Sequence, residues 1–186
     1  MLKSKTAKES LAIMTNLVLP SEINALNNMF GGELLARMDR ISSIAARTHA
    51  GSYKVVTASV NHVSFDRPIP LGSTVRLEAK VTRAFSTSME VYVDVYLYDY
   101  KNSCYEKTNN GIYTFVAVDE NNKPTRVPEL IPETEQEIER YEAALRRKQL
   151  SLVLGGRMKP EEAHELKALF SVSYTHLRAH ETLRYL

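Results

Sequence analysis

The chain has 186 residues, a length that suits one domain with its own hydrophobic core and is too short for two comfortable ones. Hydrophobic residues make up 44% and charged residues 25% of the sequence, which excludes a disordered or fibrous protein. The formal net charge of +2 is too small to indicate nucleic-acid binding, which usually needs a concentrated basic stripe. It is compatible with a small anionic ligand.

The compartment can be predicted from the cysteine content and from the first residues. Cys104 is the single cysteine, so no intramolecular disulfide can form and a reducing compartment is expected. Residues 1–9 contain no apolar stretch of the kind found in a signal peptide, and no apolar run is long enough to span a bilayer. The sequence therefore predicts a cytoplasmic protein with no membrane or nucleic-acid partner.

The first part of the chain predicts a strand, a loop and a long helix. Residues 11–19 are strand-like up to Pro20, and residues 21–30 form a polar loop rich in asparagine. From Gly31-Gly32 to about Ala50, apolar residues recur at helical spacing on one side and polar residues on the other. The apolar side is Leu34, Leu35, Met38, Ile41 and Ala45, and the polar side is Glu33, Arg37, Arg40, Ser43 and Arg47.

Four further strands are predicted after the helix, with a hairpin connection over residues 84–88 and a polar loop over residues 99–110. The strands cover residues 55–65, 75–82, 89–97 and 112–118, and the middle two alternate apolar and polar residues strictly. This order predicts an α+β fold with the four strands in an antiparallel meander. Because one helix cannot cover both faces and all edges of such a sheet, at least a dimer is expected.

The C-terminal part predicts a helical extension. A helix that follows Pro132 starts with acidic residues, continues to basic ones and ends at Gly155-Gly156; a second short helix opens at Pro160 and ends near Phe170. The last stretch follows no strand or helix pattern and is interpreted as a non-native or disordered tail. The predicted divisions are an N-terminal segment 1–9, a domain 10–125, an extension 126–170 and a tail 171–186.

The candidate catalytic residues lie between Pro20 and Asp39. Gly31-Gly32 at a helix start leaves approachable backbone N–H groups, which suit a carbonyl oxygen that becomes negative. Asp39 lies about two turns further on, at the border of the apolar side, where a carboxylate can act as a general base or as a nucleophile. The amide of Asn24 could orient a water molecule or hold the carbonyl. The plain alternatives are a tight turn before a helix and a surface aspartate paired with Arg40 or Ser43.

The same window resembles the acyl-CoA thioesterases of the hotdog superfamily, in the branch of the YciA-like enzymes and brain acyl-CoA hydrolases. The shared pattern is Pro20, Asn24, Gly31-Gly32 and Met38-Asp39. Further matches are Val56-Thr57-Ala58, Phe65, Pro68, Thr87-Ser88 and the run from Tyr113 to Asp119. The resemblance covers roughly residues 10–170, and its motifs are specific in combination.

This resemblance implies a hotdog fold, in which a five-stranded antiparallel sheet wraps a long central helix. It implies hydrolysis of acyl-CoA to a carboxylic acid and CoA, in dimers with interfacial active sites that commonly assemble as trimers of dimers. Asp39 would be the catalytic carboxylate, Gly31 and Gly32 would polarise the thioester, and Asn24 would assist. Thr87 and Ser88 would contact the CoA part of the substrate, and no metal or separate cofactor is implied.

Two positions depart from the family pattern. Asn27 stands where many relatives have glycine, but asparagine tolerates left-handed backbone better than most residues. Phe85-Ser86 precede Thr87 where relatives often have glycine, which weakens the CoA assignment more than the catalytic one.

The sequence gives weaker support to three other functions. An acyl-CoA-binding sensor would keep the pocket and lose the carboxylate, whereas Asp39 and Gly31-Gly32 are both present. A hotdog dehydratase would need a histidine, and none lies within residues 20–47. His176 and His180 have the spacing of a zinc pair on a helix, but they lie in the atypical tail and a third ligand would be required.

Overall fold

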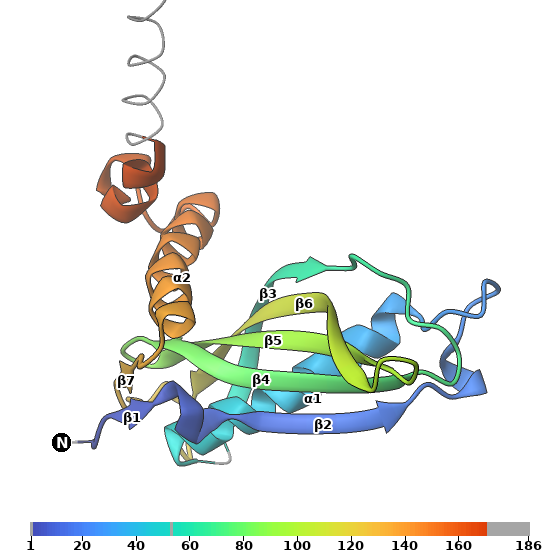
Figure 1. Ribbon diagram of the computed structural model, residues 1–186. Coiled ribbons are helices and arrows are strands. Elements are labelled where there is room, and N and C mark those ends of the chain that lie inside the picture. The colour runs from blue at the N-terminus through green and yellow to red at the C-terminus, as the bar shows by residue number, and fades with distance from the viewer. Residues whose placement is uncertain (1, 53, 171–186) are drawn as a thin grey trace, which may run out of the picture. The chain divides into compact units, whose positions relative to one another are not determined.

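The computed structural model describes residues 2–52 and 54–170 (Figure 1). Two compact units divide the chain, residues 1–138 and residues 139–186. The predictions for residues 171–186, the histidine pair included, lie outside the described residues. The division of the chain at residues 125 and 170 stays a prediction. None of the helices within the described ranges is both long and apolar enough to cross a membrane.

The first unit is built on a five-stranded antiparallel sheet with the strand order β2-β4-β5-β6-β3. The strands are β2 (Ala12–Leu17), β3 (Val55–Ser64), β4 (Thr74–Ala84), β5 (Ser88–Asp99) and β6 (Cys104–Ala117). The alternation predicted for the two middle strands is confirmed, because Val75, Leu77, Ala79 and Val81 of β4 and Met89, Val91, Val93 and Val95 of β5 are fully buried.

Helix α1 (Gly31–Ala50) lies along one face of this sheet and contacts all five strands (Figure 1). Its predicted apolar side is buried at Leu34, Met38, Ile41 and Ala45. Gly51 ends the helix in the left-handed region with a φ of 67°, and its N–H donates to Arg47 O. This long helix under the sheet confirms the predicted hotdog architecture.

The prediction that Arg37 lies on an exposed polar side of the helix is wrong, because its side chain is buried. Its Nη2 donates to Leu17 O at 3.0 Å and to Glu22 Oε1 at 2.7 Å. The N–H of Leu19, and then the guanidinium of Arg37, lower the pKa of Glu22 against the opposing effect of burial. Arg37 therefore ties α1 to the segment that precedes it, and this contact could not be predicted from the helical spacing.

The predicted meander is correct for β4, β5 and β6 and wrong for β3. Strand β3 pairs with β6, as in the register Val55↔Ala117 and Ser64↔Asn110, and so lies at the sheet edge opposite β2. Alternation predicts that a segment is a strand but does not predict its neighbour. The consequence is that β3 leaves one row of backbone groups without a strand partner in the described chain.

The polar loop predicted for residues 99–110 is also wrong over most of its length. Strand β6 starts at Cys104, and the register Asp99↔Cys104 leaves only a short hairpin turn at residues 100–103. Glu106 and Lys107 carry no apolar signal, but their backbone pairs with Leu97 and Tyr96 of β5. Strand pairing therefore extends β6 into a sequence that is locally loop-like.

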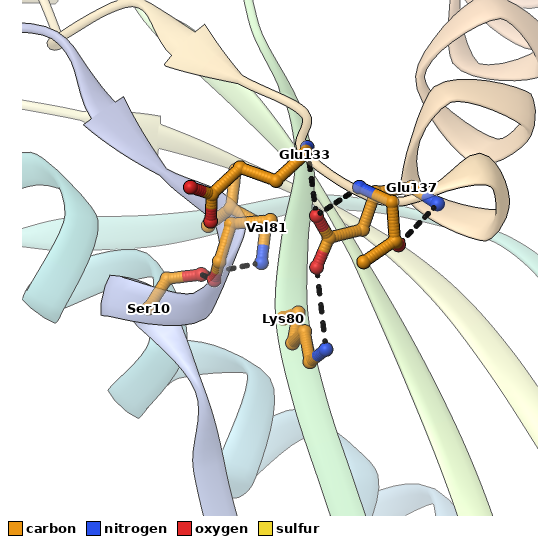
Figure 2. A network of polar contacts seen from close by, with 7 residues as sticks. Ser10, Lys80, Val81, Glu133 and Glu137 are labelled. Carbon is orange, nitrogen blue, oxygen red and sulfur yellow. Dashed lines mark hydrogen bonds and ion pairs between the residues drawn. The ribbon is translucent and has the colours of Figure 1, made fainter.

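The ends of the first unit are tied to strand β4. Strands β1 (Lys5–Thr6) and β7 (Leu130–Ile131) form a small parallel pair. Ser10 Oγ accepts the N–H of Val81 at 2.9 Å, and Glu137 lies 3.4 Å from Lys80 Nζ and accepts the N–H of Glu133. Figure 2 draws these contacts. These contacts fix the start of α2 (Glu135–Leu154) on the sheet.

The second unit contains most of α2 and the short helical segments after it. As predicted, Gly155-Gly156 ends α2, with Gly156 at a φ of 65°. A 3-10 helix over Pro160–Glu162 follows, and residues 164–170 are helical. The N–H of Leu166 donates to Gln149 Oε1 at 2.9 Å, which holds this last segment against α2.

His49 provides a stability prediction. Its side chain is fully buried at the end of α1, and its Nε2–H donates to Pro128 O at 2.9 Å. Burial lowers the pKa of His49, the bond to Pro128 and the charge of Glu9 oppose this, and the charge of Lys5 adds to it. Because the folded protein binds this proton less readily than the unfolded chain, stability is full above about pH 6.5 and falls as the pH decreases.

The measurement is the free energy of unfolding by urea between pH 5 and 8. His49→Gln should flatten the loss below about pH 6.5, whereas His62→Gln, at an exposed position on β3, should retain it. An unchanged slope in the His49 variant would show that other groups cause the loss.

Candidate active site

The loop before α1 is organised by Asn24. Its Oδ1 accepts the N–H of Leu26 at 2.9 Å and that of Asn28 at 3.2 Å, which is a local turn built by a side chain. Asn27 has a φ of 57°, so the asparagine at this position does adopt the left-handed conformation expected for it. With Oδ1 engaged, the Nδ2 of Asn24 has no acceptor among the described residues and stays available as a donor.

The start of α1 presents two further donors. Phe30 O accepts the N–H groups of Glu33 and Leu34, so these are engaged within the first turn. The N–H groups of Gly31 and Gly32 have no acceptor in the described part of the chain, as the end of a helix leaves them. A Cβ on Gly31 would lie 3.4 Å from Phe65, and a Cβ on Gly32 would meet nothing within 4 Å. Both N–H groups are thus approachable, with the positive end of the helix dipole behind them.

Asp39 lies further along α1 and faces β3. Thr57 Oγ1 donates to Asp39 Oδ1 at 2.8 Å, while Oδ2 has no donor among the residues described. The side chain is half-buried, and neither Arg40 nor Ser43 bonds it, since Ser43 Oγ donates to Arg40 O. One oxygen is therefore fixed and the other is open, which is the arrangement that a general base or nucleophile needs.

Tyr113 of β6 lies beside this carboxylate. Burial, followed by the negative charge of Asp39, raises the pKa of Tyr113 to about 12. Its hydroxyl therefore stays protonated and donates to Leu35 O at 3.2 Å. Neither Tyr113 nor Thr57 received a role from the sequence, because both lie far from Asp39 along the chain and only strand pairing brings them to it.

The predicted CoA-binding residues lie at the same end of the sheet as Thr57. Val116 of β6 pairs with Val56 on one side and with Ser88 on the other. The hairpin is closed by the N–H of Phe85, which donates to Ser88 O. The N–H of Ala117 in β6 donates to Thr87 O and holds the hairpin against that strand. Thr87 and Ser88 are half-buried, so the hairpin keeps a defined shape without the glycine often found there in relatives.

Within one chain the predicted site residues form two groups. Asn24, Gly31 and Gly32 surround the start of α1, and Asp39 joins Thr57 beside the hairpin. Asp39 follows Gly31 by eight residues, which is about 12 Å along the helix. The carboxylate must act within about 3 Å of the thioester carbon, and the N–H groups must lie within about 3 Å of the oxygen bonded to that carbon. One thioester group therefore cannot meet Asp39 and Gly31 of the same chain.

A single central helix wrapped by an antiparallel sheet, with donors at its start and a carboxylate on its side, defines a hotdog-fold thioesterase. Residues 26–104 match the family described as the Thioesterase superfamily. The chain is 39% identical over 145 residues to the uncharacterized acyl-CoA thioester hydrolase YkhA of Bacillus subtilis, covering 78% of this chain and 84% of that protein. This chain therefore belongs to the acyl-CoA thioester hydrolases of that superfamily.

Solved structures of acyl-CoA hydrolases are similar to this chain over most of its length. An acyl-CoA hydrolase from Staphylococcus aureus, in complex with butyryl-CoA, CoA and CoA disulfide, has a TM-score of 0.76 at 32% identity and covers 93% of this chain and 99% of that chain. A hexameric acyl-CoA thioesterase has a TM-score of 0.75 at 41% identity over 80% of this chain and 94% of that chain. Solved variants of the Staphylococcus aureus enzyme replace an aspartate, an asparagine or a threonine by alanine.

Proposed function

We propose that this protein hydrolyses acyl-CoA thioesters to a carboxylic acid and CoA, with Asp39 as the catalytic carboxylate. The observation that carries the proposal is the state of that side chain: it is half-buried on α1, fixed through Oδ1 by Thr57 and open at Oδ2. The same three residue types that were replaced in the Staphylococcus aureus hydrolase stand here as Asp39, Asn24 and Thr57.

The chemistry needs a base or nucleophile and a site for negative charge. Asp39 Oδ2 either takes a proton from the water that attacks the thioester carbon or attacks that carbon itself. The carbonyl oxygen becomes negative and is stabilised by the N–H groups of Gly31 and Gly32. The C–S bond then breaks, and CoA leaves as the thiolate, which takes up the proton that Asp39 or solvent supplies. In the nucleophilic route the acyl group is left on Asp39 as an anhydride, and a water molecule then hydrolyses it to the carboxylic acid and restores the carboxylate. Asn24 Nδ2 is the additional donor for the carbonyl or the water, and no metal or separate cofactor enters these steps.

The two groups of residues come together when two chains associate. Strand β3 is an edge with exposed apolar residues, among them Val56 at 50% and Val60 at 51% exposure. Two copies of β3 paired antiparallel about a two-fold axis would place the Thr57 end of one strand beside the Ser64 end of the other. Asp39 of one protomer would then face the start of α1 of its partner, so that a dimer contains two complete sites.

The contacts with CoA, the higher assembly and the location of the protein complete the proposal. Thr87 and Ser88 lie at the Asp39 end of the sheet and are proposed to contact the CoA part of the substrate. Higher assembly as a trimer of dimers is proposed by similarity to the hexameric thioesterase. A cytoplasmic location suits these substrates, and the single cysteine agrees with it.

Release of free thiol from acyl-CoA esters of increasing chain length tests the function. Saturable turnover is expected with at least one ester, together with a native mass of a dimer or a multiple of it. Saturable CoA binding without thiol release from any ester would instead indicate a non-catalytic acyl-CoA sensor.

Thr57 is proposed to position Asp39 without touching the substrate. Thr57→Val removes the hydroxyl and keeps the shape, and it should reduce kcat by about 10-fold with little change in KM, since the carboxylate loses its fixed orientation. Thr57→Ser, which keeps the hydroxyl, should restore kcat. Equal kcat values in the valine and serine variants would show that the Thr57–Asp39 hydrogen bond has no part in turnover.

A further inference from the structure

The hairpin between β4 and β5 has its carbonyl groups occupied. Ser86 and Thr87 form the two-residue loop between these strands. Ser86 O accepts the N–H of Val127 at 3.2 Å, and Thr87 O accepts the N–H of Ala117 at 3.0 Å. Both carbonyl groups of the loop are therefore bonded to the segment that follows β6, and the loop offers a ligand few acceptors.

The donors of the same loop are free. The N–H groups of Ser86 and Thr87 have no acceptor in the part of the chain that the structure describes, and their hydroxyl groups form no hydrogen bond there either. Ser86 is exposed and Thr87 is half-buried, so a ligand can approach both residues. Successive backbone N–H groups that point away from the protein are a common way of binding an anion. The loop is thus rich in donors and suits a negatively charged group.

Arg126 adds a positive charge beside this loop. The N–H groups of its two neighbours are both bonded, that of Thr125 to Ala117 O at 2.9 Å and that of Val127 to Ser86 O. Val127 is buried, so the backbone on both sides of Arg126 is held against the hairpin. The side chain of Arg126 itself is exposed and has no hydrogen bond or ion pair with any of the described residues. Its guanidinium is therefore available to a ligand at the loop.

The carboxylates of the turn that precedes Arg126 are engaged elsewhere. Glu120 forms an ion pair with Lys54 at 2.5 Å. Asp119 Oδ1 accepts the N–H groups of Asn121 and Lys123 and so closes the turn. Neither carboxylate bonds to Arg126, which leaves the guanidinium without a counter-ion in the described chain.

We infer that Arg126 and the loop of Ser86 and Thr87 bind the phosphate groups of CoA, an inference that rests on the proposed hydrolysis of acyl-CoA. The phosphate and pyrophosphate groups of CoA are negatively charged and are rich in acceptors, which complements a loop with free donors and a free cation. Arginine suits such a group because its planar fork of N–H donors matches two phosphate oxygens at once. The contact recognises the CoA part of the substrate and is independent of the acyl group.

The test compares hexanoyl-CoA with hexanoyl-pantetheine, which has the same thioester and no phosphate group, by thiol release. Arg126→Gln should raise KM for hexanoyl-CoA about 10-fold and leave kcat unchanged, because a charge-assisted contact remote from the reacting atoms is lost. For hexanoyl-pantetheine, kcat/KM should stay at the wild-type value. Ser86→Ala should act in the same direction by about 3-fold, because only one neutral donor is removed. Inhibition of turnover by free CoA should weaken in Arg126→Gln by the same factor as KM rises.

Lys101→Gln is the matched control. Lys101 is an exposed cation in the turn between β5 and β6, at the other end of β5, so its replacement should leave both esters unaffected. The inference is overturned if the ratio of kcat/KM for hexanoyl-CoA to that for hexanoyl-pantetheine is the same in wild type and in Arg126→Gln. Absence of thiol release from both esters by the wild type would contradict the hydrolase function itself, so the two failures are distinguished.

Discussion

Replacing Asp39 by alanine or asparagine is expected to reduce kcat for thioester hydrolysis by about 10³-fold. Both changes remove the proton acceptor, and the asparagine keeps the size and can keep an acceptor for Thr57 Oγ1, which donates to Asp39 at 2.8 Å. Asp39 is half-buried at the sheet face and takes no part in an ion pair in the described chain. The oligomer and its melting temperature should therefore change little in Asp39→Asn. Thiol release at saturating acyl-CoA, with native mass on the same sample, measures both effects.

Asp119→Asn is a suitable control for this substitution. Asp119 Oδ1 accepts the N–H groups of Asn121 and Lys123 in the turn after β6, and an asparagine oxygen can accept the same bonds. This variant should keep wild-type turnover. Near-wild-type hydrolysis by a correctly assembled Asp39→Asn protein would remove Asp39 from the mechanism.

Deleting one backbone donor at the start of α1 should have the second largest effect. Gly31→Pro removes the N–H of Gly31 and should reduce kcat by about 10²-fold or more, the effect of losing one oxyanion donor. Proline is well tolerated at the first position of a helix, and Phe30, with a φ of −62° and a ψ of 137°, already has the backbone that precedes proline. Gly31→Ala keeps the N–H, and its Cβ would lie 3.4 Å from Phe65, so it is the matched control. The kcat ratio of these two variants isolates the donor.

The same variant tests whether two chains form each site. Co-expression of Gly31→Pro chains with Asp39→Ala chains should yield mixed dimers in which one of the two sites has both groups intact. Random pairing would restore about one quarter of wild-type activity. No recovery in verified mixed dimers would mean that Asp39 and Gly31 serve the site within one chain, against the separation of about 12 Å along the helix.

The local pattern of the sequence was enough to predict α1 and the alternating strands β4 and β5. Helical spacing of apolar residues and strict alternation are short-range signals that the residues carry themselves. The glycine pair and Asp39 were also predicted, because a helix start and a position along a helix follow from the spacing alone. The resemblance to the hotdog thioesterases gave these residues their roles, which remain predictions until the variants are measured.

The strand order, the length of β6 and the contacts of the site residues were decided by the tertiary structure. Strand β3 lies beside β6 and not β4, and β6 extends through the polar residues Glu106 and Lys107, because backbone pairing with a distant strand has no local signature. The same pairing brings Thr57 to Asp39. The sequence by itself thus determined where the helices and the apolar parts of the strands lie, and which residues can take part in catalysis. Which of them meet was determined by long-range strand order and by the packing of α1 on the sheet.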